Sequence, residues 1–340
     1  MKLLNRYKNV QFLGLYNGQM SLWYPDRLEV GEISIPTEKG DDYVIWSKTN
    51  KFLSRKRNSV EMVFQKDGFE KWPQGRFGDV NKINDCVYTY KYEGGVYSLS
   101  FFCEGEEYLV NIESDSLLSV YNIGVSSLHD VLILSRTPMF NCKSLLFYSK
   151  TGKLLWEFFG EDDCLKINGF CLPIVDNVVV IISQKIVATK KIQGFDIHTG
   201  EKLWEVNVEC GYPNTFFAGE DKMLYGCMST WNKGYVASKI QMCKLNPFTG
   251  AVEISVLKED EKYEVYPWQV TMYGRRLYYA DNRSGCEIGV IDIDKKELLD
   301  CTPLKLKRGY TIDAPVVTDD KVYQFIREMR ELRVYENVPI

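Results

Sequence analysis

The sequence contains few of the residues on which most enzyme active sites are built. Only two histidines, His129 and His198, occur among its 340 residues, and both fall in segments typical of turns. The sequence has no Gly-x-Ser-x-Gly motif, no phosphate-binding loop and no His-Glu-x-x-His motif. We therefore expect no catalytic residues, no cofactor and no metal site.

Paired cysteines and long apolar runs are also missing. The ten cysteines include no Cys-x-x-Cys and no adjacent pair, and Cys86, Cys227 and Cys243 fall inside apolar segments that resemble strands. This pattern favours reduced, structural thiols over a disulfide or metal framework. No run approaches the length of a membrane span, and the first ten residues lack the apolar core of a signal peptide. We expect a cytoplasmic protein, or a periplasmic one if a signal peptide has been removed.

The chain has no excess of positive charge and no strong helical pattern. Its 42 Lys and Arg residues and 46 Asp and Glu residues leave a formal net charge of −4. Binding to nucleic acid or to an anionic membrane is therefore not expected. Apolar residues recur instead with the period of two that is typical of β-strands.

The sequence does contain a repeated motif. Thr-Gly-x-x-x-Trp occurs at Thr151–Trp156 and again at Thr199–Trp204, and a weaker version without tryptophan begins at Thr249. The glycines, Gly152, Gly200 and Gly250, are 48 and 50 residues apart. A constant period of this length indicates a repeat architecture.

A second pattern, a turn followed by an apolar β-run, recurs in steps of 43 to 54 residues. Its seven occurrences begin at Asp42, Asp85, Asp130, Asp176, Asp221, Arg275 and Asp320. Each interval contains four short strand-like segments, which cannot bury both faces without neighbouring units. The prediction is an all-β, seven-bladed β-propeller of four-stranded antiparallel blades, formed by residues 1–340 as a single domain.

The ends of the chain suggest how such a ring closes. The last unit has strand-like segments near Val316 and at 321–326 and 331–336, and then the chain stops one strand short. Two early segments, 10–16 and 20–24, flank the hairpin signal Asn17-Gly18. We expect an N-terminal strand to complete the last blade, and either segment is a candidate.

The repeated motifs, each preceded by an apolar strand such as Phe147–Lys150 or Phe195–His198, resemble the pyrroloquinoline-quinone-type (quinoprotein-like) propeller repeat. This repeat occurs in quinoprotein dehydrogenases and in non-enzymatic outer-membrane assembly lipoproteins. The resemblance covers the repeats around Trp156 and Trp204 and implies a way of packing more than an activity. The adjacent cysteine pair that many of the quinone enzymes carry is missing here, so no quinone cofactor is expected.

The candidate binding residues lie in loops that a propeller places around one mouth of its central channel. These are the connections between successive blades and those between second and third strands, whereas His129 and His198 belong to the opposite face. Loops on a rigid scaffold often carry binding sites, and Trp, Tyr and Arg are enriched in binding hot spots. Any one of these aromatic residues could instead cap the inner end of a blade. The candidates are Trp72, Arg76, Tyr212, Trp231, Tyr266, Trp268, Arg308 and Tyr310.

Three functions are compatible with these observations. The first is a non-enzymatic scaffold that binds a protein or peptide through the aromatic-rich loops. The second is a small-molecule-binding or enzymatic, quinoprotein-like propeller with a ligand in the channel mouth, where Arg76 and Arg308 would meet an anionic group. The third is an assembly component similar to the outer-membrane lipoproteins. We favour the first, because no catalytic motif accompanies the aromatic loops.

Overall fold

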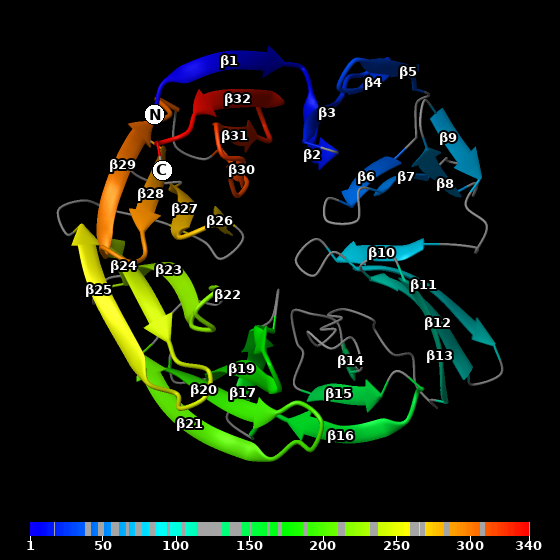
Figure 1. The fold of residues 1–340 in the computed structure, drawn as a ribbon, viewed down its shortest axis with the longest axis vertical. Helices are drawn as coiled ribbons and strands as arrows, with labels where there is room; N and C mark the ends of the chain where they lie inside the picture. Colours follow the sequence, from blue (N-terminus) through cyan, green and yellow to red (C-terminus); the bar gives the residue numbers. More distant parts are fainter. Residues whose placement is uncertain are drawn as a thin grey trace.

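The protein, described by a computed structural model, is built from β-strands that surround a common centre (Figure 1). Within the described residues the strands form eight sheets with antiparallel neighbours, and no helix there is long and apolar enough to cross a membrane. The structure describes residues 1–16, 18–37, 42–46, 51–55, 61–65, 68–71, 77–81, 86–93, 96–103, 106–113, 131–135, 144–149, 151–161, 164–168, 172–185, 189–209, 215–231, 237–258, 265, 269–281, 286–306 and 310–339.

The first four sheets along the chain each follow sequence order. They are β2 (Gln11–Tyr16), β3 (Gln19–Trp23), β4 (Arg27–Val30) and β5 (Ile33–Pro36); β6 (Asp42–Trp46), β7 (Lys51–Arg55), β8 (Glu61–Gln65) and β9 (Gly68–Lys71); β10 (Phe77–Asn81), β11 (Cys86–Glu93), β12 (Val96–Cys103) and β13 (Glu106–Glu113); and β14 (Val131–Ser135), β15 (Ser144–Ser149) and β16 (Leu154–Phe159).

The next three sheets have the same meander, with one extra strand in the first of them. They are β17 (Cys164–Asn168), β18 (Ile174–Val175), β19 (Val178–Lys185), β20 (Thr189–Asp196) and β21 (Lys202–Glu209); β22 (Phe217–Ala218), β23 (Leu224–Trp231), β24 (Ala237–Leu245) and β25 (Val252–Lys258); and β26 (Val270–Tyr273), β27 (Arg276–Asp281), β28 (Glu287–Asp292) and β29 (Glu297–Pro303).

The last sheet, here called the terminal sheet, contains both ends of the chain. Its order is β30 (Val316–Val317), β31 (Lys321–Ile326), β32 (Glu331–Glu336) and β1 (Leu3–Lys8). β1 pairs antiparallel with β32, from Leu3 opposite Tyr335 to Lys8 opposite Glu331. The expectation that an N-terminal strand joins the last unit is confirmed, but neither predicted segment is that strand.

The physical reason for this error is the exposure of β1. Five of its six residues are exposed, so it shows no apolar alternation by which a strand could be recognised. The two segments that do alternate, β2 and β3, pair with each other in a separate sheet.

The predicted number of seven blades is therefore corrected to eight sheets in the described part of the chain. Four occurrences of the second sequence pattern lie just before the second strand of a sheet. They begin at Asp176, Asp221, Arg275 and Asp320, before β19, β23, β27 and β31. Asp42 instead begins β6, the first strand of its sheet. In the first sheet the second strand, β3, begins just after Gly18, and assigning the Asn17-Gly18 signal of the sequence to ring closure concealed one unit.

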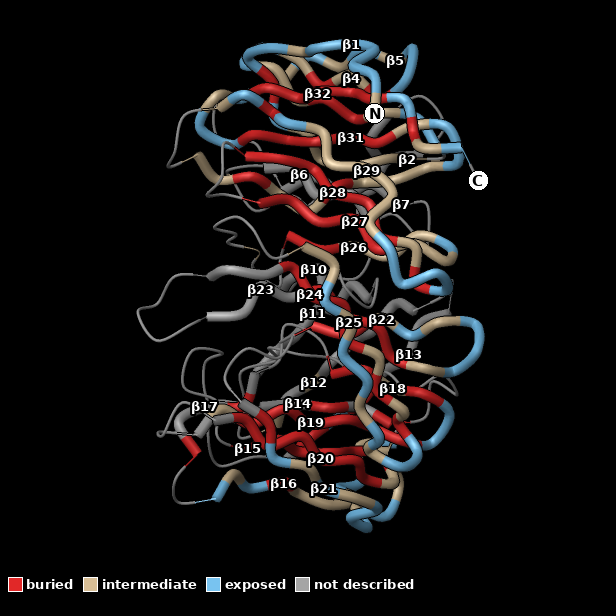
Figure 2. Tube along the Cα trace, turned by 90° about the vertical axis from the view of Figure 1, so that its left-hand side faces the viewer, coloured by how far each residue is buried: buried red, intermediate tan, exposed pale blue. Residues whose placement is uncertain are grey.

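The apolar core lies between successive sheets. On β19, Val179 and Ile181 pack toward β14 and β15 of the preceding sheet. Val178, Val180 and Ile182 pack toward Leu224, Cys243 and Leu245 of the following sheet. A strand buried on both faces is apolar throughout, which explains the run Val178–Ile182. Figure 2 shows such buried segments as successive layers.

Candidate functional site

The meander gives the molecule two different faces. We call the turn face the side that carries the connections from first to second and from third to fourth strands, such as Asp176-Asn177 and 197–201. The loop face is the side on which second strands end and third strands begin, and on which one sheet leads to the next, as at the end of β23 and at the end of β29. Of the predicted binding residues, Trp231 ends β23 at the loop face, and Tyr310 lies in the connection from β29 to β30.

Most of the predicted binding residues lie outside the described part of the chain. Two of the eight fall within it: Trp231 is the last residue of β23, opposite Ala237, and Tyr310 is half-buried in the connection from β29 to β30. The other six are Trp72, Arg76, Tyr212, Tyr266, Trp268 and Arg308. The binding site thus remains a prediction, and the described loop face tests only its framework.

That framework is clearest after Tyr310, where the chain is held against two sheets. The side chain of Gln269, fully buried at the start of β26, donates from Nε2 to the carbonyl of Ile312 at 3.0 Å. Ile312 is also buried and bridges to Ile326 of β31. Because residue 269 follows Trp268 and residue 312 follows Tyr310 by two positions, the chain near both predicted loops converges on one place.

The next residues extend this anchoring into the terminal sheet. Gln324 donates from Nε2 to the carbonyl of Asp313 at 2.6 Å. Arg327 pairs through Nε with the Asp313 carboxylate, also at 2.6 Å, and its backbone N–H donates to the carbonyl of Thr311. Buried backbone groups that find such partners hold a connection in one conformation.

Glu328, in the turn between β31 and β32, also holds the segment of residues 311–313. Its carboxylate accepts from the backbone N–H of Thr311 at 2.7 Å and from the Thr311 hydroxyl at 2.5 Å. Burial opposes ionisation of this carboxyl, but the hydrogen bonds from Thr311 outweigh burial and hold the pKa of Glu328 below its ordinary value.

A buried ion pair on β32 positions an arginine that links the terminal sheet to the chain after β29. Arg333 and Glu331 are separated by 2.5 Å, with only 5% and 4% of their side chains exposed. Arg333 also donates from Nη1 to the carbonyl of Leu304 at 2.5 Å. Burial would lower the pKa of Arg333, but the contact with Glu331 outweighs it and raises that pKa.

Sequence reasoning missed these polar anchors. Gln269 and Gln324 are fully buried, and Glu331 and Arg333 nearly so. The signal that was available is a long polar side chain inside a strongly apolar strand, as in Val-Tyr-Gln-Phe-Ile at 322–326. Such residues are rarely buried unless they are hydrogen-bonded or paired.

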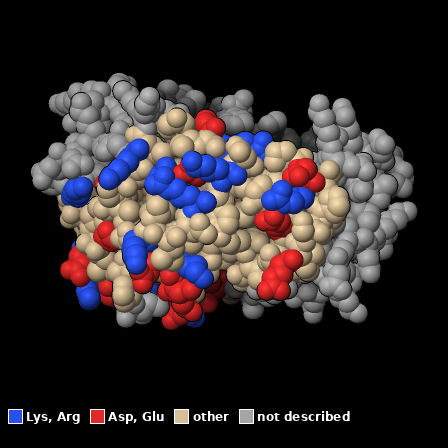
Figure 3. Space-filling model, turned by 90° about the horizontal axis from the view of Figure 1, so that it is seen from above, with Lys and Arg blue, Asp and Glu red and all other residues tan. Residues whose placement is uncertain are grey.

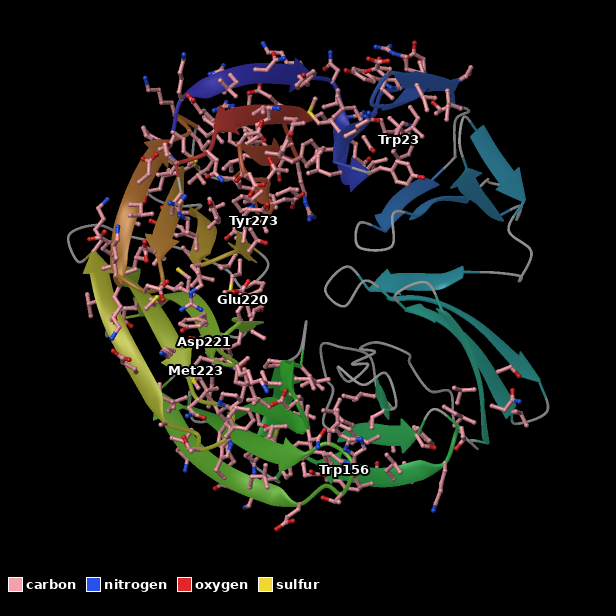
Figure 4. The ribbon with its side chains drawn as sticks, in the orientation of Figure 1. Trp23, Trp156, Glu220, Asp221, Met223 and Tyr273 are labelled. Atoms are coloured by element: carbon pink, nitrogen blue, oxygen red, sulfur yellow. The ribbon has the colours of Figure 1, made fainter. Side chains whose placement is uncertain are left out.

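On the turn face, successive sheets are linked at equivalent positions. Asp176 pairs with Lys222 at 2.8 Å, and Tyr273 donates to Asp319 at 2.9 Å. Between them, Arg275 pairs with Asp221 at 3.3 Å and with Asp294. Figure 4 shows Asp221 and Tyr273 on neighbouring sheets. Several residues that mark the repeat in the sequence thus also connect one unit to the next.

Both repeated tryptophans lie between sheets, as predicted, although each is half-buried. Trp156 stacks on Phe147 with ring centroids 3.7 Å apart, and its indole donates to the carbonyl of Ile197 in the next sheet at 2.8 Å (Figure 4). Trp204 donates in the same way to Pro247 at 2.6 Å. These tryptophans therefore serve packing between repeats.

Of the two histidines, only His198 lies in the described part of the chain. His198 lies in the turn after β20, where its backbone N–H donates to the Asp196 carboxylate at 3.0 Å. This placement on the turn face agrees with the prediction. His129 lies outside the described residues.

No protein-family model and no curated protein matches this sequence. Solved structures do resemble the fold. The Dos1 propeller has a TM-score of 0.56 and 9% identity, covering 100% of this chain and 95% of its own. Kuenenia stuttgartiensis hydrazine synthase has a TM-score of 0.52 and 10% identity, covering 85% and 93%. At such identities the comparison shows the fold alone, and with the arrangement of sheets it defines the chain as a β-propeller.

Proposed function

We propose that this β-propeller is a non-enzymatic scaffold that binds a protein or peptide through its aromatic loop face. The observation that carries the proposal is the anchored segment from Tyr310 to Asp313. Gln269, Gln324 and Glu328 hold it with side-chain hydrogen bonds, so two aromatic loops start from a rigid base. A rigid base lowers the entropy that loops lose when a partner binds.

The different positions of the tryptophans support the same proposal. Trp156 and Trp204 are used in packing between sheets. Trp231 ends β23 at the loop face, and in our proposal Trp72, Tyr212, Tyr266, Trp268 and Tyr310 belong to loop-face connections, with Arg76 and Arg308 beside them. In our proposal these side chains gather around one mouth of a closed ring, where a partner covers them.

We also propose that the chain uses the quinoprotein-like repeat and works in the cytoplasm. The contact of each repeated tryptophan with the Thr-Gly turn of the next sheet supports the first statement. A Cβ built on Gly200 would lie 2.6 Å from the Trp156 ring, and one on Gly250 would lie 2.5 Å from the Trp204 ring. The cysteine pattern of the sequence favours the second.

The test pairs melting temperature with partner capture on the same alanine variants. Trp72→Ala and Trp268→Ala are expected to abolish capture of a partner from an extract of the native host, with melting temperatures nearly unchanged. Phe248→Ala is the matched control, because Phe248 is an aromatic residue, 39% exposed, in a turn-face connection.

Two results would contradict the proposal. If both tryptophan variants lose several degrees of thermal stability, their side chains cap blades and do not form a binding site. If both are stable and still capture the partner, the binding site lies elsewhere.

A further inference from the structure

The outermost strand of the terminal sheet differs in charge from every other outermost strand. β1 carries Arg6 and Lys8 and no acidic residue, a net charge of +2. The other seven outermost strands are neutral or acidic, from 0 on β5, β9 and β25 through −1 on β16 and β21 and −2 on β29 to −3 on β13. The whole chain has a net charge of −4, so this local excess of cations runs against the average.

Two more cations lie near the loop-face end of β1. Arg6 stands opposite Arg333 in the strand pairing, and Arg333 bonds to the carbonyl of Leu304, which precedes Lys305. The backbone carbonyl of Arg330 accepts from the N–H of Val10, two residues after Lys8. We call Arg6, Lys8, Lys305 and Arg330 the basic edge.

The side chains of the basic edge are available to a partner. All four residues are exposed, and none of their side chains makes an ion pair with another described residue. In contrast, Arg327 pairs with Asp313, and Arg333 is buried with Glu331. Figure 3, which looks onto β1 from outside, shows Lys and Arg side chains across the upper part of this surface, with Asp and Glu side chains beside and below them.

Protection against aggregation does not explain the sign of this charge. Charged side chains on an edge strand, lysine in particular, discourage pairing with other chains. The outer strands β13 and β29 carry acidic residues instead. Cations alone, beside exposed Leu3 and Leu4, indicate attraction for a partner of opposite charge.

We propose that the basic edge binds an acidic polypeptide segment, which adds in extended conformation to the free edge of β1. β1 is the last strand of its sheet and pairs only with β32 among the described strands, so its outer backbone groups can form a further ladder. A nucleic acid offers no such ladder, and a long polyanion would be repelled by the net negative charge of the chain. Arg6 and Lys8 lie on an outer strand, apart from the predicted aromatic residues, whereas Lys305 shares a connection with Tyr310. The test does not involve the partner of the aromatic loops.

The test measures binding of a defined peptide to the intact chain by fluorescence anisotropy at low salt. The probe is a labelled 12-residue peptide of alternating Glu and Thr. It should bind saturably, and the double variant Arg6→Glu/Lys8→Glu should bind about tenfold more weakly or worse, because reversal turns two attractions into repulsions. Lys153→Glu is the matched control: Lys153 is exposed, without an ion pair among the described residues, and next to outer strand β16.

Two modified peptides separate strand addition from simple attraction. A peptide with Gln in place of Glu should not bind, and one with Glu retained but alternate backbone nitrogens methylated should bind much more weakly. Lys305→Glu, which lies outside any strand, should also weaken binding, and it keeps the test decisive if the β1 variant fails to fold.

The proposal is overturned if Lys305→Glu and the double variant bind like the unmodified chain, or if the Gln peptide binds equally well. Equal binding of the N-methylated peptide would also overturn it, because the surface would then be a general anion patch. Tighter binding of single-stranded RNA or of phosphatidylserine vesicles, with the same dependence on Arg6 and Lys8, would reject a polypeptide partner.

Discussion

At the residue scale, the contact between a tryptophan and the next glycine turn explains the repeated motif. Gly152, Gly200 and Gly250 have φ values of 83°, 74° and 74°, a conformation that glycine adopts easily. The turn after β28 has Lys296 at φ 57° in the corresponding place. Backbone conformation therefore favours glycine without requiring it. The Thr-Gly-x-x-x-Trp motif is absent where the turn does not pack under a tryptophan.

Two glycines with the same backbone conformation separate these effects. A Cβ at Gly18, with φ 74°, meets nothing within 4 Å, whereas at Gly200 it meets the Trp156 ring. We expect Gly18→Ala to cost about 1 kcal/mol of unfolding free energy for the left-handed conformation alone. Gly200→Ala should cost roughly 1–3 kcal/mol more, because Trp156 must move. Equal midpoints of urea unfolding for the two variants would show that the tryptophan contact contributes nothing.

At the scale of elements, the junctions between sheets combine an apolar inner part with polar links. Between the sheets of β14–β16 and β17–β21, Phe147, Trp156 and Phe195 form the apolar part. Lys191, with 8% of its side chain exposed, forms the polar part with Glu161 and Glu205. The sequence predicted the strands on both sides of this junction, but not its charged groups, because the strand pattern does not say which polar residues face a neighbour.

The pH dependence of stability should report on this junction. Hydrogen bonds from Lys202 and Lys191 lower the pKa of Glu205 from 4.5 to about 2. A carboxyl with a lowered folded-state pKa stabilises the fold above the unfolded-state value, and the contribution is lost as pH falls through 4.5 toward 2. Glu205→Gln should therefore cost about 1 kcal/mol at pH 7 and almost nothing near pH 2.

Urea unfolding at pH 7, 4 and 3 measures this difference. Glu201→Gln, in the adjacent turn, is the control, because Glu201 is exposed and makes no ion pair within the described residues. A difference between Glu205→Gln and the unmodified chain that stays constant from pH 7 to pH 3 would contradict the ionic role.

At the scale of the whole molecule, the two ends of the chain share one sheet, and this determines the count of units. Because β1 completes the terminal sheet, the strands β2–β5 are free to form a sheet of their own. Buried side chains from Val10 and from β3, β31 and β32, including Leu22 and Phe325, then pack together, with half-buried residues of β2 against them. Contacts distant in sequence thus hold the start and end of the chain in place.

Removal of residues 1–9 should show how much these contacts contribute to thermal stability. The truncated chain exposes the edge of β32 and loses Tyr7 from the core beside it. We expect the melting temperature to fall by more than about 5 °C, since a loss of 1 kcal/mol lowers it by roughly 2–4 °C in a large domain. A synthetic peptide of residues 1–10, added to the truncated chain, should restore part of the loss.

The same peptide with Arg6→Pro is the control, because proline in the strand cannot form the ladder with β32. An unchanged melting temperature after truncation would show that β1 contributes no stability.

Residue patterns along the chain predicted the all-β architecture, the four-stranded units and the boundaries of the last three strands near residues 316, 321–326 and 331–336. It could do so because strand alternation and turn chemistry are local properties that survive in one dimension. Contacts in the folded chain pair β1 with β32, assemble the described strands into eight sheets, and use Gln269, Gln324 and Arg333 to hold the loop face. Those features depend on which segments meet in space, and an exposed strand or a single buried polar residue leaves no periodic trace in the sequence.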